Sequence, residues 1–186
     1  MPPITRFTLL ALFLIAPAVQ AERADRQKPI YIQSDKLSGD DRSKGIIYEG
    51  HVKLVQGTLE LSADRILITQ DADGFQKGVA TGGKDGLARY RQKRDGKDEY
   101  FEGEAERIEY YGRTDKARLF IRAMARSGLN ETRGQYIEYD GYAEQYLVTS
   151  GPNASIAKPG SEQVRTIFYP KATSPEAAAS KPASGS

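Results

Sequence analysis

Residues 49–66 have the sequence EGHVKLVQGTLELSADRI, and this stretch decides the fold class. Apolar residues alternate with polar or charged ones at Val52 and Leu54 and again at Leu59 and Leu61, and the alternation continues from Ile66 to Ile68. Strict alternation over several residues predicts a strand with one buried and one exposed face. The stretch therefore predicts half-buried β-strands.

The same pattern extends in both directions from this stretch, over residues 29–169. Pairs of alternate apolar residues recur at Ile30/Ile32, Ile108/Tyr110, Leu119/Ile121 and Ile137/Tyr139. The apolar spacing of an amphipathic helix is nearly absent, and Gly, Asp and Asn interrupt the alternation at short intervals. Short strands separated by turn-forming residues predict an all-β, antiparallel fold.

Four short segments of this region resemble one another. They are Ser34–Leu37, Ala63–Ile66, Ala105–Ile108 and Gly134–Ile137, each with a small, a polar, a long and an aliphatic residue in order. Each is followed after a turn by another predicted strand. A repeat of about thirty residues in an all-β chain predicts stacked β-units. Ordinary similarity among hairpins is the alternative explanation.

Composition limits the chemistry that the chain can perform. The sequence has no Cys, one His, 27 Lys and Arg against 25 Asp and Glu, and 39% hydrophobic residues. These values exclude disulfides and thiol catalysis, give no metal-ligand cluster, and lack the basic excess of nucleic-acid binders. Acidic pairs such as Asp71/Asp73 fall in predicted turns. We therefore expect no enzyme, no metal, no cofactor and no nucleic-acid partner.

The two ends differ from the middle. Residues 1–21 combine Arg6, an apolar run from Phe7 to Val19 and the small residue Ala21, which predicts a cleaved signal peptide and export to a bacterial periplasm. Residues 22–28 are expected to be a flexible N-terminal segment. Residues 171–186 are rich in Ala, Ser and Pro and predict a disordered tail. The predicted β-domain spans residues 29–170.

The stretch at 49–66 resembles the signature of the OstA-like family of periplasmic lipopolysaccharide-transport proteins. Residues 29–35, 102–110 and 164–167 resemble its first strand, a later repeat and its closing strand. The resemblance implies an open, twisted antiparallel β-jellyroll with an apolar groove between two sheets that takes the acyl chains of lipid A. The cleavable signal and the short chain point to the soluble carrier rather than to the membrane-attached relatives.

The resemblance also implies partners and site residues. The carrier is expected to bind lipopolysaccharide through lipid A and to associate head to tail, forming a bridge between an inner-membrane LptC-like partner and an outer-membrane LptD-like partner. The expected groove lining is Ile30, Ile32, Leu61, Ile66, Ile68, Ile108 and Tyr110. The expected docking edges are Ile30 and Ile32 at one end and Val164, Ile167 and Phe168 at the other.

Two points remain open at the level of sequence. The basic run from Arg89 to Arg94 either contacts lipid phosphates or forms a solvated hairpin arm. The function is either lipid transport or a structural envelope scaffold whose inward residues are plain core. A polysaccharide hydrolase is a third and weaker alternative, because it needs a carboxylate pair in a polar cleft.

Overall fold

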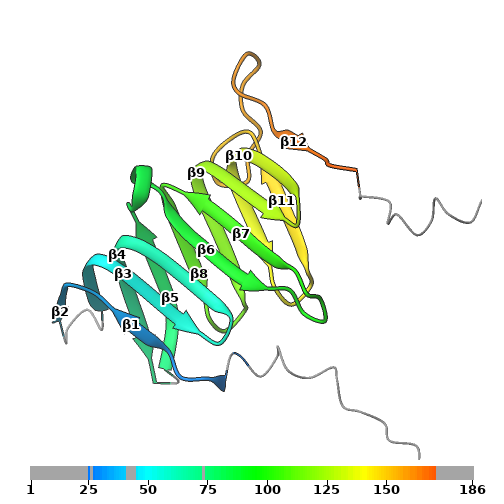
Figure 1. The fold of residues 1–186 in the computed structure, drawn as a ribbon. Coiled ribbons are helices and arrows are strands. Elements are labelled where there is room, and N and C mark those ends of the chain that lie inside the picture. The colour runs from blue at the N-terminus through cyan, green and yellow to red at the C-terminus, as the bar shows by residue number, and fades with distance from the viewer. Residues whose placement is uncertain (1–24, 26, 41–44, 73, 171–186) are drawn as a thin grey trace, which may run out of the picture.

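The structure, a computed structural model, describes residues 25, 27–40, 45–72 and 74–170. The regular structure of these residues is almost entirely β (Figure 1). The prediction of an all-β antiparallel fold is confirmed. The strands are β1 (Tyr31–Gln33), β2 (Lys36–Asp40), β3 (Gly45–Gln56), β4 (Leu59–Asp71), β5 (Gly74–Thr81), β6 (Ala88–Lys93), β7 (Tyr100–Ala105), β8 (Arg107–Tyr111), β9 (Lys116–Ser127), β10 (Asn130–Asp140), β11 (Gln145–Thr149) and β12 (Arg165–Ile167). A 3-10 turn, η2 (Lys84–Gly86), joins β5 to β6.

The strands form two layers that share their longest members. The front sheet has the order β1, β3, β4, β6, β7, β9, β10, β12, and the back sheet has the order β2, β3, β4, β5, β8, β9, β10, β11. In β4, for example, residues 60–62 pair with β6 in the front sheet, whereas residues 65–71 pair with β5 in the back sheet. Likewise, residues 116–120 of β9 pair with β8 in the back sheet, and residues 124–127 pair with β7 in the front sheet.

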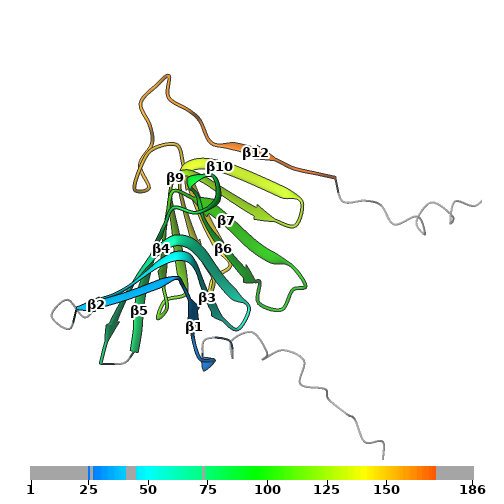
Figure 2. The same cartoon turned by 60° about the vertical axis from the view of Figure 1, so that its left-hand side comes forward.

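The long strands cross between the sheets along one side of the molecule, which we call the spine. In β3 the crossing falls at Gly50 and His51, and in β9 it falls at Ile121 and Arg122; all four have positive φ. The β3–β4 register shifts between Glu49 and Val52, and a further shift lies in β10. Such bulges bend a strand sharply. The two layers therefore meet at the spine and splay apart on the opposite side (Figure 2).

The four predicted repeats coincide with the four places where the chain passes from the front to the back sheet. Ser34–Leu37 joins β1 to β2, Ala63–Ile66 lies within β4, Ala105–Ile108 joins β7 to β8, and Gly134–Ile137 lies within β10. Every front-to-back crossing is followed by a hairpin in the back sheet and a return to the front sheet. The repeat therefore marks one circuit of the chain around the two sheets.

The polar residue of the repeat makes a side-chain contact between two crossings at the spine. Asp35 Oδ2 lies 2.8 Å from His51 Nδ1. Asp64 Oδ2 accepts a hydrogen bond of 2.8 Å from the Gly83 N–H, and Glu106 Oε1 accepts one of 2.7 Å from Arg122 Nε. In each case a carboxylate of the outgoing crossing holds the return crossing. This contact accounts for the polar residue in three of the four repeats; the fourth repeat has Gln135 at this position.

The Asp35–His51 contact makes stability depend on pH. The hydrogen bond to Asp35 and the charge of that carboxylate raise the pKa of His51 above its ordinary value of 6.5. A raised pKa contributes stability below the ordinary value, and this contribution is lost as pH rises through the folded-state pKa. We expect the melting temperature to fall slightly from about pH 6 to about pH 8, measured by circular dichroism. His51→Asn, which tolerates the positive φ, should remove this slope; an equal slope in both proteins would contradict the assignment.

The inward faces of the two sheets form one continuous core. Its largest fully buried side chains belong to both layers and include Leu54, Leu61 and Tyr90 of the front sheet and Ile68, Ile108 and Leu119 of the back sheet. Ile30, Ile32, Tyr48, Phe75 and Val148 are partly buried and pack against this core. The interior is thus apolar along its whole length, and its ends are less well covered than its middle.

The N-terminal segment differs from the expectation at Asp25. This residue is buried, and its carboxylate accepts a hydrogen bond of 2.7 Å from the Thr58 N–H and an ion pair of 2.6 Å from Lys28. It thereby holds the turn between β3 and β4, so this part of the expected flexible segment is packed against the domain. The predicted signal peptide and tail lie outside the described residues. No helix among those residues has the length and apolar character needed to span a membrane.

Candidate functional site

The structure places the predicted groove residues on the inward faces of the sheets. Five of them are fully buried, with exposed fractions of 0–1%, and they belong to the core; these are Leu61, Ile66, Ile68, Ile108 and Tyr110. Ile30 and Ile32 lie at the N-terminal end of the interior and are only partly covered. The predicted inward orientation is therefore present, and contact with a ligand remains a prediction for all seven.

Opposite the spine, two rows of turns, one from each sheet, face each other along a line that we call the mouth (Figure 2). The front sheet contributes the turns between β3 and β4, β6 and β7, and β9 and β10. The back sheet contributes those between β4 and β5, β8 and β9, and β10 and β11. Turns carry no ladder hydrogen bonds from one sheet to the other, so side chains must close the mouth.

A hollow of about 190 Å³ lies at the C-terminal end of the mouth. Its walls include Phe101 of β7, Tyr146 of β11 and Phe168, which follows β12. Tyr146 stands opposite the buried Tyr139 in the β10–β11 ladder, so both face inward. The Phe101 and Tyr139 rings stack with centroids 3.8 Å apart. Because Tyr146 and Phe168 are 55% and 73% exposed, this aromatic hollow is open to solvent.

Polar side chains bridge the two sheets beside this hollow. Asp115, in the turn between β8 and β9, is buried and accepts hydrogen bonds of 3.0 Å from the Tyr110 hydroxyl and 3.2 Å from Gln92 Nε2. Glu144, in the turn between β10 and β11, pairs with Arg94 at 3.3 Å and Lys97 at 2.6 Å. Gln92, Arg94 and Lys97 belong to the β6–β7 hairpin of the front sheet.

These carboxylates also act on the neighbouring phenol. Burial, and then the charge of Glu144, raise the pKa of Tyr139 to about 12. Tyr139 therefore remains a neutral phenol at physiological pH, and the stacked aromatic wall keeps its apolar character. Sequence reasoning missed Asp115 and Glu144, because acidic residues in turns are ordinary. The alternation of Tyr146 with Val148 was a signal that would have placed Tyr146 on the inward face.

The basic run from Arg89 to Arg94 is divided between two surfaces. Arg89 and Arg91 lie on the outer face of the front sheet, where they pair with Glu104 at 3.0 Å and Glu102 at 3.2 Å. Cross-strand pairs of this kind form a solvated charge ladder. Arg94, by contrast, reaches the mouth. Arg89 and Arg91 thus belong to a solvated hairpin arm. Lys93 and Arg94 pair with Asp98 at 3.3 Å and Glu99 at 3.4 Å in the same hairpin, and contact of Arg94 with lipid phosphates stays a prediction.

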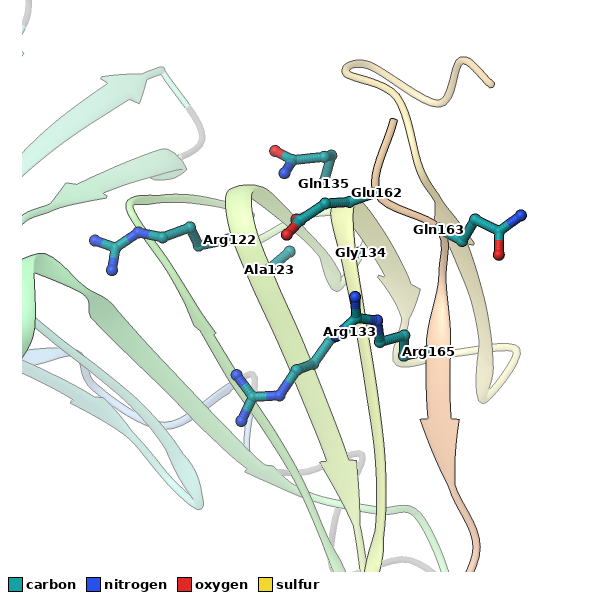
Figure 3. Close-up of a pocket in the computed structure, with 8 residues that line it drawn as sticks. All are labelled: Arg122, Ala123, Arg133, Gly134, Gln135, Glu162, Gln163 and Arg165. Atoms are coloured by element: carbon teal, nitrogen blue, oxygen red, sulfur yellow. The ribbon is translucent and has the colours of Figure 1, made fainter. Parts of the chain in front are cut away.

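Figure 3 shows a second hollow, of about 220 Å³, near the spine at the C-terminal end. Its walls carry Arg122, Arg133 and Arg165 from β9, β10 and β12, together with Glu162. Arg122 pairs with Glu106 and Arg133 with Glu131, each at 2.7 Å. Since carboxylates pair with two of the three arginines and Glu162 lies on the same wall, the charge of the hollow does not by itself define an anion site.

No group of three or more His, Cys, Asp or Glu residues suited to a metal ion occurs in the part of the chain that the structure describes. The single His is engaged with Asp35 at the spine. The acidic residue Asp71, which sequence analysis placed in a turn, ends β4 and pairs with Arg113 at 2.6 Å.

The two ends of the stack carry exposed apolar side chains. At the N-terminal edge, Tyr31 of β1 and Leu37 of β2 are 66% and 61% exposed. At the C-terminal edge the exposed residues come from β11, from β12 and from the chain around β12; they are Tyr146, Leu147, Val164, Ile167, Phe168 and Tyr169. The predicted docking residues Val164, Ile167 and Phe168 thus lie on a sheet edge.

Two sheets joined along one spine, with an apolar interior and free strands at both ends, define an open, twisted β-jellyroll. Residues 31–145 match the protein family described as LptA/(LptD N-terminal domain) LPS transport protein. The match covers more than half of the chain, and the chain belongs to this family.

Individual relatives agree with this assignment. The lipopolysaccharide export system protein LptH of Pseudomonas aeruginosa is 27% identical over 149 residues, covering 77% of this chain and 83% of the relative. The lipopolysaccharide export system protein LptA of Escherichia coli K12 is 28% identical over 133 residues, covering 70% of this chain and 71% of the relative.

A solved structure supports the fold independently. The crystal structure of Pseudomonas aeruginosa LptH, described as the LptA homologous periplasmic component of a lipopolysaccharide transport device, superposes with a TM-score of 0.69. The superposition covers 79% of this chain and 99% of LptH, at 23% identity. The predicted β-jellyroll is confirmed.

Proposed function

We propose that this protein is a periplasmic, non-enzymatic carrier that binds lipopolysaccharide and keeps the acyl chains of lipid A in the interior between its two sheets. The observation that carries the proposal is a largely apolar interior with a hollow of aromatic walls beside it at the C-terminal end of the mouth. Burying a CH₂ group contributes about 0.8 kcal/mol, so exposing a chain of roughly ten carbons costs about 8 kcal/mol as an upper limit. A carrier must therefore keep such chains covered.

The fully buried middle of the interior sets a condition on this proposal. Five of the predicted groove residues are already fully buried in the core; these are Leu61, Ile66, Ile68, Ile108 and Tyr110. Acyl chains therefore reach them only if the sheets move apart at the mouth. The spine is held by backbone ladders, whereas side-chain contacts bridge the mouth in the part of the chain that the structure describes. Ile30 and Ile32 at one end and the aromatic hollow at the other are the first contacts available to a chain.

We also propose head-to-tail association into a bridge. Each sheet contains eight strand segments in antiparallel order, so the two edge strands of a sheet run in opposite directions. A second copy that pairs its β1 and β2 with β12 and β11 of the first thus keeps the same orientation and the antiparallel pattern. Free edges invite such strand addition, and the exposed apolar residues of both edges give it a hydrophobic contribution.

The same edges fit partners of the same fold. The family resemblance places an inner-membrane LptC-like partner at the N-terminal edge, around Ile30 and Ile32. It places a further copy or an outer-membrane LptD-like partner at the C-terminal edge, around Val164, Ile167 and Phe168. A signal peptide over residues 1–21 would deliver the chain to the periplasm, and the tail over 171–186 is expected to be dispensable for folding.

The competing function is a structural scaffold in which the interior is plain core, and the complete burial of the central residues favours it. The two functions differ in bound lipid. Protein purified gently from the periplasm and extracted with organic solvent should yield lipid A. A Tyr146→Asp/Phe168→Asp variant, changed only at exposed positions of the hollow, should yield several-fold less at an unchanged melting temperature. Absence of lipid A from the unmodified protein would favour the scaffold.

A further inference from the structure

Two cations from the front sheet meet one carboxylate oxygen from the back sheet at the mouth. Arg94 Nη2 lies 3.3 Å and Lys97 Nζ lies 2.6 Å from the same atom, Glu144 Oε2. Arg94 and Lys97 belong to the loop between β6 and β7, and Glu144 belongs to the turn between β10 and β11. This contact therefore spans the mouth, and any ligand that enters here must separate it or pass it.

Glu144 fits this position poorly. Its second oxygen, Oε1, is buried and has no hydrogen-bond partner, although both cations crowd the first oxygen. Its backbone has a φ of 51°, a left-handed conformation that is unfavourable for Glu. A buried acceptor without a partner and a strained backbone each carry a cost in free energy. The two cations thus hold a carboxylate whose second oxygen has no partner, while Arg94 is also paired with Glu99 at 3.4 Å.

The surroundings of Arg94 combine charge with apolar surface. Its guanidinium lines the aromatic hollow together with Phe101, Tyr146 and Phe168, and its side chain is only 20% exposed. It also donates a hydrogen bond of 3.0 Å to Ser127 Oγ, which fixes it at the edge of the hollow. A cation at the rim of a hollow with aromatic walls can pair with the charge of an anionic amphiphile whose chain contacts those walls.

We propose that Arg94 and Lys97 form a subsite for a phosphate group of the bound lipid, and that Glu144 occupies this subsite when the lipid is absent. A phosphate offers three acceptor oxygens and matches the planar donors of an arginine. On binding, it would displace the Glu144 carboxylate by like-charge repulsion and release the strained turn, which separates the two sheets at the mouth. The subsite rests on the proposed function and deepens it.

The test compares a bisphosphorylated lipid A with the same lipid stripped of its phosphates, using the dissociation constant measured by fluorescence. The unmodified protein should bind the phosphorylated form roughly tenfold more tightly. Lys97→Gln should reduce this ratio, and Arg94→Gln/Lys97→Gln should bring it close to one. Glu144→Gln should raise it, because the competing charge is gone. Arg91→Gln is the matched control, since Arg91 lies on the outer face of the same hairpin.

The possible failures are distinguishable. Equal binding of both lipids by the unmodified protein would overturn the subsite and leave the carrier function intact. An unchanged ratio in Lys97→Gln, with circular dichroism showing a native fold, would also overturn it even if the double variant does not fold. Binding of neither lipid would overturn both proposals. Inorganic phosphate alone should not raise the melting temperature; a rise that depends on Lys97 would indicate a free-phosphate site and overturn the assignment to lipid.

Discussion

A photoreactive amino acid at Tyr146 should capture lipopolysaccharide in living cells, whereas the same amino acid at Leu147 should capture almost none. The two positions are neighbours on β11 and are similarly exposed, at 55% and 50%. They point in opposite directions because side chains alternate along a strand. Tyr146 stands opposite the buried Tyr139, and Leu147 stands opposite Glu138, which pairs with Arg118 on the outer face.

Tyr146 and Leu147 therefore lie on the same strand, with similar exposure and similar accessibility to the label. They differ only in the face of the sheet from which the side chain projects. Capture is measured by the appearance of a slower, lipopolysaccharide-reactive species after irradiation, and we expect a difference of at least about tenfold, as for an all-or-none contact. Neither position belongs to the fully buried core, so the fold should tolerate both substitutions. Comparable capture at the two positions would show that lipid meets the protein without entering the hollow, and the carrier proposal would lose its binding site.

The sequence predicted the strands well because the side chains of a paired strand alternate between the core and the solvent, and this alternation is visible in the sequence. In an antiparallel sheet, a residue that faces the core recurs every second position. Leu61, Ile66, Ile68 and Ile108 could be placed on the inward face for this reason, and all four are fully buried. The repeat was visible because each front-to-back crossing has a small residue followed by a polar one, which is a carboxylate in three of the four repeats.

The return crossings from the back sheet to the front sheet were not predictable from the same pattern. A strand that bends from one sheet into the other keeps its alternation, so β3 resembles a single strand in sequence although its halves pair with different neighbours. The cause of a bend lies in single residues with positive φ, such as His51 and Ile121, whose side chains do not favour that conformation. Tertiary contacts impose it there, and no sequence pattern records them.

Sequence analysis missed the polar contacts that close the mouth for a similar reason. Asp25, Asp115 and Glu144 belong to segments that are locally polar, and sequence alone assigns such residues to solvent. Their partners are distant in the chain, since Asp25 holds Thr58 and Glu144 holds Arg94. Glycine at 141 is part of the same arrangement, because a Cβ there would lie 2.3 Å from Asp115 Oδ2. Only the folded chain brings these groups together.

Blocking one edge of the stack should stop assembly beyond single copies, and mixing two differently blocked variants should give dimers. Tyr31→Lys/Leu37→Lys places charges on the exposed positions of β1 and β2, and Leu147→Lys/Ile167→Lys does the same on β11 and β12. All four side chains are at least half exposed, so folding should be unaffected. Lysine on an edge strand opposes pairing with another strand.

The two variants distinguish a head-to-tail joint from a symmetric one. In a head-to-tail joint each contact uses one N-terminal and one C-terminal edge, so either variant alone should have the mass of a single chain in light scattering. Their mixture retains one usable edge on each partner and should stop at dimers, because both outer edges are blocked. Gln76→Lys, at an exposed position of β5 in the middle of the back sheet, should still form rods whose length grows with concentration. If instead one blocked variant dimerised by itself, the joint would be symmetric and would use the edge that remained intact in that variant, and a bridge of repeated copies could not be built through it.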